Sequence, residues 1–225
     1  MVTVVVSLYT PLPGRRPLLD VEIDLAQTSA EWTTELPGGF QRASIGLPRA
    51  RPSPYPGYLP RSLGSVQGRE HVVIMVGSAT VFEGQLVEVV RVDGEPRAFV
   101  AEGYGGIGLT ERVYRSAVPT QLTGGQLVTA AMQLLPHIAI SSLFQDPGGS
   151  YTSSEFDGQT VAEIIRRVAQ MGSGDGRIWD WAVWEGPQLV LGPRTEPAQP
   201  DWIVDRAGVE ETISYERLVS RVSVV

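Results

Sequence analysis

VVIMVGSATVFEGQLVEVVRVDGEPRAFVAEGYGGIGL, residues Val72 to Leu109, decides the fold class expected for this chain. The stretch consists of apolar or alternating runs separated by glycine-containing dipeptides, and Asp-Gly between alternating strands is a strong hairpin signal. It predicts three consecutive antiparallel strands with turns at Glu83-Gly84 and Asp93-Gly94. No cluster of acids, bases or nucleophiles interrupts this meander, which is typical of a scaffold. The expected strands are Val72–Phe82, Gln85–Val92 and Arg97–Ala101.

The rest of the first half also has the pattern of short strands. Glycine and proline separate them, as in Pro37-Gly38-Gly39, and this punctuation is typical of an antiparallel sandwich or barrel. The expected strands are Val2–Leu8, Leu18–Leu25, Glu31–Glu35, Phe40–Leu47 and Glu111–Ala117.

The sequence changes character after Pro119, where apolar residues recur at helical spacing. A threonine followed three residues later by Gln or Glu predicts a capping box at the start of each of two helices. The boxes are Thr123 with Gln126 and Thr160 with Glu163, and the helices are expected to end at Pro136 and Gly172.

A hairpin and two further strands are expected after the helices. Glu185-Gly186-Pro187 separates Arg177–Trp184 from Gln188–Leu191, and the last strands are Ile213–Tyr215 and Val219–Val225. The fold class predicted is α+β: an antiparallel β-barrel followed by a small α/β domain with two helices and a hairpin. The expected domains are 1–119 (barrel), 120–200 (α/β) and 201–225 (C-terminal strands, the possible start of a second barrel).

Composition excludes several classes of function. The chain has no cysteine, so disulfide and thiolate chemistry are absent. Its formal net charge of −7 argues against a dedicated nucleic-acid binder, and we expect no sequence-specific binding of nucleic acid. No apolar run approaches the ~20 residues of a membrane span, and the N-terminus has the pattern of a strand, not of a signal peptide.

The segment 36–69 contains no acidic residue but is rich in arginine and proline. Residues 48–69 predict a long loop with extended, polyproline-like structure. Either this loop is solvated surface, or it is an arm that packs tyrosines and arginines on a neighbouring subunit, where both residue types are enriched. The candidate interface residues are Arg42, Arg49, Arg51, Tyr55, Tyr58, Arg61 and Arg69.

One motif matches a cofactor fingerprint literally. Gly103-Tyr-Gly-Gly-Ile-Gly108 has the G-x-G-x-x-G spacing of dinucleotide-binding turns, which also require a helix at the third glycine and a downstream acid. The pattern after Leu109 is extended, so the glycines are interpreted as a sharp corner of the sheet. We expect no cofactor.

Candidates for catalysis are sparse. His71 and His137 are the only histidines and lie far apart in the sequence, so no zinc spacing exists and both are expected to be structural. A carboxylate pair would have to come from scattered acids such as Glu83, Glu102 or Asp180. Trp179, Trp181 and Trp184 could stack on sugars, but large aromatic side chains more often belong to a core. We therefore expect no catalytic site and no metal site.

The order of these segments resembles the baseplate or tail-tip hub proteins of tailed bacteriophages, the late control protein D family. The segments that carry the resemblance are Glu31-Trp32 with Leu36–Phe40, Val81–Leu86, Val100–Leu109, Asp157–Ile165 with Trp179–Val183 and Leu189–Pro193, and Tyr215–Val225. The resemblance implies a barrel of tail-tube type, a middle domain, and a re-entry into a second barrel. The chain ends at Val225 where that second barrel would begin, so it is expected to be the amino-terminal part of a hub or a hub whose second barrel is absent or separately encoded.

The resemblance implies a structural, non-enzymatic subunit of the virion tail, assembled in the host cytoplasm. It would join the tail tube to the host-contacting tip and surround the channel for genome or tape-measure protein. Its partners would be its own copies in a closed ring, as a trimer or else a hexamer, and other tail proteins: distal tail or tube, tape measure, and tip or fibre. The alternatives are a hexameric distal tail adaptor and, from another class, a cell-wall glycan hydrolase or carbohydrate-binding module.

Overall fold

The computed structural model describes residues 4–12, 17–23, 29–46, 69–92, 95–172, 174, 176–194, 209–214 and 219–224. The chain divides into two compact units. The first comprises Met1–Thr34, Phe40–Gly103 and Asp205–Val225, and the second comprises Glu35–Gly39 and Tyr104–Val204. The domain boundaries expected at residues 119 and 200 stay a prediction.

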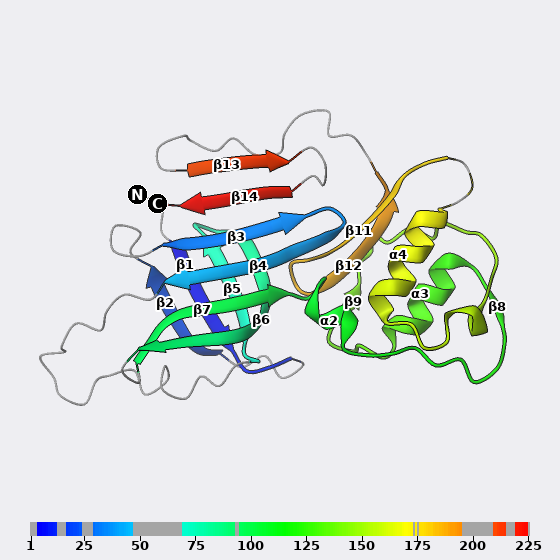
Figure 1. Cartoon of the computed structure of the whole chain (residues 1–225), viewed down its shortest axis with the longest axis horizontal. Coiled ribbons are helices and arrows are strands. Elements are labelled where there is room, and N and C mark those ends of the chain that lie inside the picture. Colours follow the sequence, from blue (N-terminus) through cyan, green and yellow to red (C-terminus); the bar gives the residue numbers. More distant parts are fainter. Residues whose placement is uncertain are drawn as a thin grey trace, which may run out of the picture. The chain divides into compact units, whose positions relative to one another are not determined.

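The first unit is a curled sheet (Figure 1). Its strands follow the order β13-β14-β3-β4-β7-β6-β5-β1-β2. No pairing between the described residues of the terminal strands β13 and β2 closes this path. The strands are β1 (Val4–Tyr9), β2 (Pro17–Ile23), β3 (Ala30–Glu35), β4 (Gly38–Gly46), β5 (His71–Val76), β6 (Ala79–Val92), β7 (Glu95–Gly103), β13 (Val209–Ser214) and β14 (Val219–Val224).

Alternation along these strands builds the core of the first unit. Successive side chains of a strand point to opposite faces, so every second residue contributes to one apolar layer. Phe40 and Phe82 meet in this unit, with their ring centroids 5.9 Å apart. The most deeply buried side chains are Val4, Val6, Leu8, Ile45, Val72, Ile74, Phe82, Leu86, Phe99 and Ala101.

The meander predicted from residues 72–109 is present, but its first turn was misplaced. β5 pairs with β6 and β6 pairs with β7, all antiparallel. The β5–β6 hairpin turns at Gly77-Ser78, where Gly77 has a φ of +61°, and β6 runs straight through Glu83-Gly84. Val92 pairs with Glu95, while the expected second turn, residues 93 and 94, lies outside the described residues.

Gly84 and Gly103 allow neighbouring backbones to pass very close to each other. The glycine at residue 84 is therefore needed for this close approach and not for a turn. A Cβ atom added at Gly84 would collide with the carbonyl of Glu102, and one at Gly103 with the carbonyl of Phe40. Glycine in a strand interior often marks such an approach.

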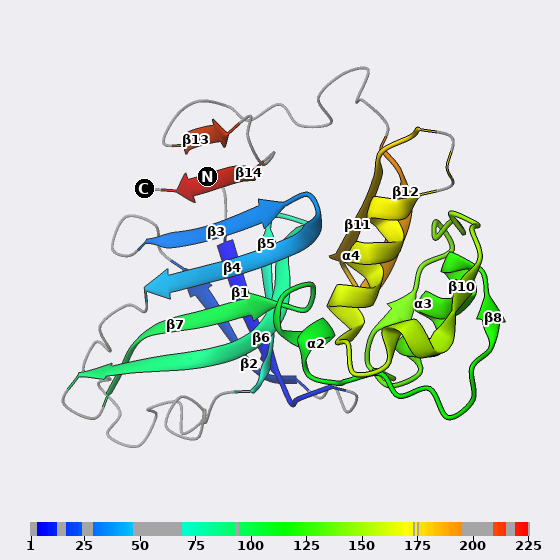
Figure 2. The same ribbon diagram turned by 45° about the vertical axis from the view of Figure 1, so that its right-hand side comes forward.

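The second unit combines short helices with a hairpin (Figure 2). Its helix α4 lies beside α3 and beside strand β11. The elements are α2 (Ile107–Thr110), β8 (Gln121–Leu122), α3 (Gly124–Met132), β9 (Ala139–Ile140), β10 (Tyr151–Thr152), the 3₁₀ helix η1 (Ser153–Phe156), α4 (Val161–Met171), β11 (Trp179–Trp184) and β12 (Gln188–Pro193).

Local chemistry places the starts of α3 and α4, and the end of α4, as predicted. The Thr123 hydroxyl accepts from the Gln126 N–H and the Thr160 hydroxyl from the Glu163 N–H, and both capping boxes are complete. Gly172 ends α4 with a φ of +55°, a conformation that favours glycine. α3 stops at Met132, earlier than the expected stop at Pro136.

Two parts of the predicted architecture are wrong. The strand expected at Glu111–Ala117 is absent: α2 precedes it, and the segment makes only an isolated bridge from Val113 to Thr160. The sheet is mixed, because β11 runs parallel to the Gly38-Gly39 end of β4 and β12 runs parallel to β9. The structure is therefore sheet-dominated with few helices, compatible with α+β, but it is not an antiparallel barrel of tail-tube type.

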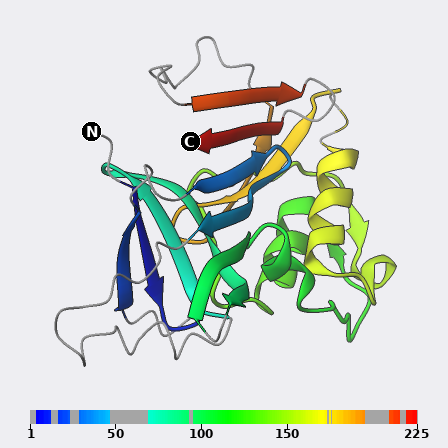
Figure 3. The same cartoon turned by 60° about the vertical axis from the view of Figure 1, so that its left-hand side comes forward.

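The C-terminal strands extend the sheet of the first unit. β13 pairs antiparallel with β14, and β14 lies next to β3 in the strand order (Figure 3). β14 lies where the sequence predicted Val219–Val225, whereas β13 begins four residues before the predicted strand Ile213–Tyr215 and shares only residues 213 and 214 with it. Tyr215 and Val225 lie outside the described residues.

Gly103→Ala should unfold or strongly destabilise the first unit. The new methyl group would meet the Phe40 carbonyl, which is backbone and cannot move aside, so we expect a loss of about 3 kcal/mol or more in the free energy of unfolding. Urea unfolding followed by circular dichroism measures the loss. Gly192→Ala is the control, because the atom nearest its added Cβ is Gln145 Nε2 at 4.0 Å, and its stability should change by less than about 0.5 kcal/mol. Equal stability of both variants would contradict the crossing.

Candidate functional site

Two of the predicted interface residues, Arg42 and Arg69, lie in the described part of the first unit. Both are exposed. Arg42 stands on β4 directly opposite Glu102 of β7, and Arg69 precedes β5 with its N–H donating to the Leu86 carbonyl at 2.7 Å. The remaining members of the set, Arg49, Arg51, Tyr55, Tyr58 and Arg61, lie outside the described residues.

Arg42 is the end of a polar row that crosses five strands. Tyr9, His71, Gln85, Glu102 and Arg42 are opposite one another in turn across β1, β5, β6, β7 and β4. Directly opposed residues share a face of a sheet, so these side chains stand in one line. Arg42 is exposed, Gln85 and Glu102 are half-buried, and His71 is buried.

The buried end of this row holds a histidine–carboxylate contact. His71 Nε2 lies 2.9 Å from Glu83 Oε1, and the two side chains are 0% and 2% exposed. The Tyr9 ring lies against the imidazole with a centroid separation of 5.6 Å, and Glu70 beside it is also buried. Buried polar groups need partners, so this contact is an internal link between β5 and β6. Glu83, a carboxylate that directly follows the largely apolar residues 72–82, was the sequence signal for it.

The scattered acids considered for catalysis already have other neighbours. Glu83 contacts His71, and Glu102 faces Arg42. In the second unit, Asp180 accepts two hydrogen bonds from Arg194, at 2.5 Å from Nε and 2.9 Å from Nη2. This hydrogen bonding raises the pKa of Arg194 above its ordinary value. Among the described residues, no group of three or more His, Asp or Glu side chains could hold a metal ion.

The glycine motif of residues 103–108 does open a helix, contrary to the prediction. α2 begins at Ile107, but it is only four residues long. An added Cβ at Gly105 would collide with the Gly38 carbonyl, so this glycine serves backbone packing within the second unit. A dinucleotide fingerprint requires a full helix after a parallel strand. The described residues around this motif do not form that arrangement.

The tryptophans belong to the core of the second unit. Trp179 and Trp181 are 9% and 5% exposed, whereas Trp184 is half-buried. β11 lies against α4, whose Val161, Ile164, Ile165 and Val168 are fully buried. Rings buried in this way offer no open stacking surface to a sugar.

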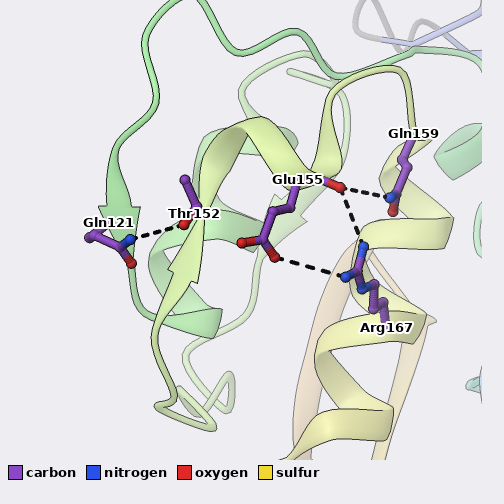
Figure 4. A network of polar contacts seen from close by, with 5 residues as sticks. All are labelled: Gln121, Thr152, Glu155, Gln159 and Arg167. Atoms are coloured by element: carbon purple, nitrogen blue, oxygen red, sulfur yellow. Dashed lines mark hydrogen bonds and ion pairs between the residues drawn. The ribbon is translucent and has the colours of Figure 1, made fainter.

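Polar contacts hold the 3₁₀ helix η1 on α4 (Figure 4). The Arg167 guanidinium lies 4.4 Å from the centroid of the Phe156 ring and donates to the Glu155 carbonyl at 3.3 Å. Gln159 Nε2 donates to the same carbonyl at 3.2 Å, and Gln121 Nε2 donates to Thr152 Oγ1 at 2.9 Å. The network is one of structural support.

Asp146 closes the N-terminal end of α3. Its carboxylate accepts from Thr123 Oγ1 at 2.5 Å, from the Gly125 N–H at 2.7 Å and from the Gly148 N–H at 2.8 Å. Burial by itself raises the pKa of Asp146, but these three hydrogen bonds outweigh it and hold the pKa below its ordinary value. A carboxylate at a helix N-terminus is also favoured by the helix dipole.

His137 is half-buried in the second unit and packs on Tyr104, with ring centroids 6.0 Å apart. Burial lowers its pKa, and so does Arg112, while Glu111 acts in the opposite direction.

No helix in the described part of the chain is long and apolar enough to cross a membrane.

Comparison with known proteins places this fold among phage tail proteins. No protein-family model and no curated protein matches the sequence. A tail protein of 43 kDa from prophage MuSo2 of Shewanella oneidensis matches with a TM-score of 0.55 at 12% identity, over 96% of this chain and 62% of that one. A tail protein from Neisseria meningitidis MC58 matches with a TM-score of 0.57 at 13% identity, over 92% of this chain and 57% of that one.

These likenesses show that this chain shares its fold with two phage tail proteins. The chain spans 62% and 57% of the lengths of the two tail proteins it matches.

Trp181→Ala should lower the free energy of unfolding of the second unit by about 3–5 kcal/mol, because a large side chain leaves a packed core. Trp184→Ala is the matched control on the same strand, and its half-buried ring should cost about 1 kcal/mol. Thermal unfolding compares the two. A stable Trp181→Ala protein that loses sugar binding would instead indicate a carbohydrate site.

Asp146→Asn should destabilise the second unit by about 1 kcal/mol at neutral pH, a modest cost because the group is exposed and screened. The pKa of Asp146 is lower in the folded protein than in the unfolded one. The carboxylate of Asp146 therefore stabilises the fold fully above the unfolded-state pKa of about 3.9, and this stabilisation is lost as the pH falls through the folded-state pKa. Urea unfolding between neutral and acid pH should therefore show the two proteins converging at low pH. Glu111→Gln controls for loss of one exposed charge, and a constant difference at every pH would contradict the account.

Proposed function

We propose that this chain is a structural subunit of the tip or baseplate hub of a phage-like tail. It joins the tail tube to the host-contacting tip and surrounds the channel for genome or tape-measure protein. The observation that carries the proposal is the fold shared with two tail proteins over 96% and 92% of this chain. The hub position rests on the order of segments, in which a strand-rich unit is interrupted by a unit with helices and the chain then returns to the first sheet.

The subunit works in a closed ring of its own copies, as a trimer or else a hexamer. The sheet of the first unit ends in the strands β2 and β13, which do not pair with each other in the described structure. Open edges pair indiscriminately unless they are protected, and a closed symmetric assembly is one protection. Distal tail or tube, tape-measure and tip or fibre proteins are the other partners in the virion tail, and assembly takes place in the host cytoplasm.

The arginine-proline segment and its neighbours supply the contact between subunits in this proposal. Arg42 and Arg69 are exposed, as such a role requires. Arginines in a chain of net charge −7 favour ion pairing with a neighbouring copy over a footprint on nucleic acid.

A distal tail adaptor, with six-fold symmetry, remains a second role in the same assembly. A glycan hydrolase or sugar-binding module receives less support, because Trp179 and Trp181 are buried and Asp180 is held by Arg194. The subunit is proposed to have no catalytic site, no cofactor and no metal.

Deletion of residues 50–66 should weaken ring formation and leave the first unit folded, because it removes two of the five arginines between residues 42 and 69 together with both tyrosines. Mass measurement in solution and electron microscopy report the ring, and circular dichroism reports folding. A variant with Arg51 and Arg61 changed to glutamine at full loop length separates the effect of charge from that of length. A ring unaltered by the deletion would contradict the interface.

A further inference from the structure

Strand β9 forms an edge of the sheet in the second unit. Among the described strands it pairs with β12 alone, in parallel. The Ala139 N–H donates to the Pro187 carbonyl at 2.8 Å, and the Ser141 N–H donates to the Leu189 carbonyl at 2.9 Å. Alternate residues of a strand bond to the same neighbour, so the N–H and C=O of Ile140 point away from β12.

Ile140 is the exposed end of a buried apolar row. It lies opposite Leu189 of β12, which in turn lies opposite Val183 of β11. Directly opposed residues share one face of a sheet. Val183 and Leu189 are 2% and 0% exposed, whereas Ile140 is 36% exposed. The row therefore stops at a strand edge with apolar surface in solvent.

The segment around β9 has no charged side chain that would protect this edge. Residues 116–145 contain no Asp, Glu, Arg or Lys, although 19% of the whole chain is charged. Leu134 and Leu143, which precede and follow β9, are 38% and 69% exposed. Edge strands are commonly protected from pairing by charged side chains, and the cores of protein interfaces are depleted of charge. The β9 edge thus has the composition of an interface.

A second copy of the same edge is an occupant of matching chemistry. An uncharged strand meets its own copy without opposing like charges, which destabilise a pair of strands. The strands at the two ends of the sheet path in the first unit differ in this respect, since each contains two acidic residues. These are Asp20 and Glu22 in β2, and Glu210 and Glu211 in β13. Charge therefore favours self-pairing at β9 over self-pairing at β2 or β13.

A two-fold axis beside Ile140 satisfies both the backbone and the side chains. In this antiparallel register, Ile140 exchanges two N–H···O=C bonds with the partner subunit's Ile140. The two isoleucine side chains then share one face, and the row that begins at Val183 and Leu189 continues into the second copy. The contact uses the same edge of both copies, so it closes after two.

We propose that β9 docks a second copy of this chain by antiparallel, two-fold pairing centred on Ile140. The strand is only two residues long, so the contact is small and association depends on protein concentration. The pairing does not rest on a role in a phage tail. It is also separate from the ring contact proposed above, which joins unlike surfaces.

Charge substitution at the two-fold axis tests the pairing. Ile140→Lys and Ile140→Glu each place like charges opposite each other, so each should raise the dissociation constant of the pair by about tenfold or more. An equimolar mixture of the two variants opposes Lys to Glu and should recover association, which only a contact of residue 140 with itself predicts. Sedimentation equilibrium over a range of concentrations reports the mass, and thermal unfolding confirms folding. Val118→Lys and Val118→Glu are matched controls at a 69% exposed position of the same unit, and both should leave the mass unchanged.

Cysteine cross-linking tests the register separately. The chain has no cysteine, so the Ile140→Cys protein carries a single thiol. Opposed residues that exchange two hydrogen bonds have Cα atoms about 5.5 Å apart, within the range that a disulfide spans. Mild oxidation should therefore give a covalent dimer of Ile140→Cys and little dimer of Val118→Cys. Charged variants of unchanged mass, a mixture that fails to recover, or equal cross-linking of the two cysteine variants would each overturn the proposal.

Discussion

The crossing of β6, β7 and β4 at two glycines is the constraint on which the first unit depends. Gly84 brings β6 against the Glu102 carbonyl, and Gly103 brings β7 against the Phe40 carbonyl. No side chain fits at either position, so the sheet can curl tightly there while Phe40 and Phe82 pack in its interior. The polar row from Tyr9 to Arg42 and the buried His71–Glu83 contact follow from the register that this crossing sets.

Local signals in the sequence predicted local structure well. Thr123 and Thr160 begin their helices because a hydroxyl at the N-cap and a Gln or Glu three residues later satisfy backbone N–H groups without help from the rest of the chain. The hairpin of β11 and β12 and the pairing of β5, β6 and β7 were predicted from alternation and from turn residues in the same way.

The errors arose where distant residues decide the structure. Gly84 looks like a turn residue, but its role is set by Glu102, and the turn falls at Gly77 instead. The parallel pairing of β11 with Gly38-Gly39 joins segments far apart in the sequence, which no local pattern reports. Among the candidate interface residues, Arg42 and Arg69 are described, and both are exposed. Whether they contact another subunit depends on a partner that the structure of a single chain does not contain.

The proposed structural subunit would act through its surfaces. Within the described residues, several ionisable side chains are engaged in internal contacts, such as His71–Glu83, Asp180–Arg194 and Asp146 at α3. The central claim is that the chain is a structural tail subunit that forms a closed ring. Electron microscopy of the purified protein, with its mass measured in solution, tests this most directly. The account predicts a closed ring without turnover of peptidoglycan. A stable monomer that cleaves cell-wall glycan would contradict it.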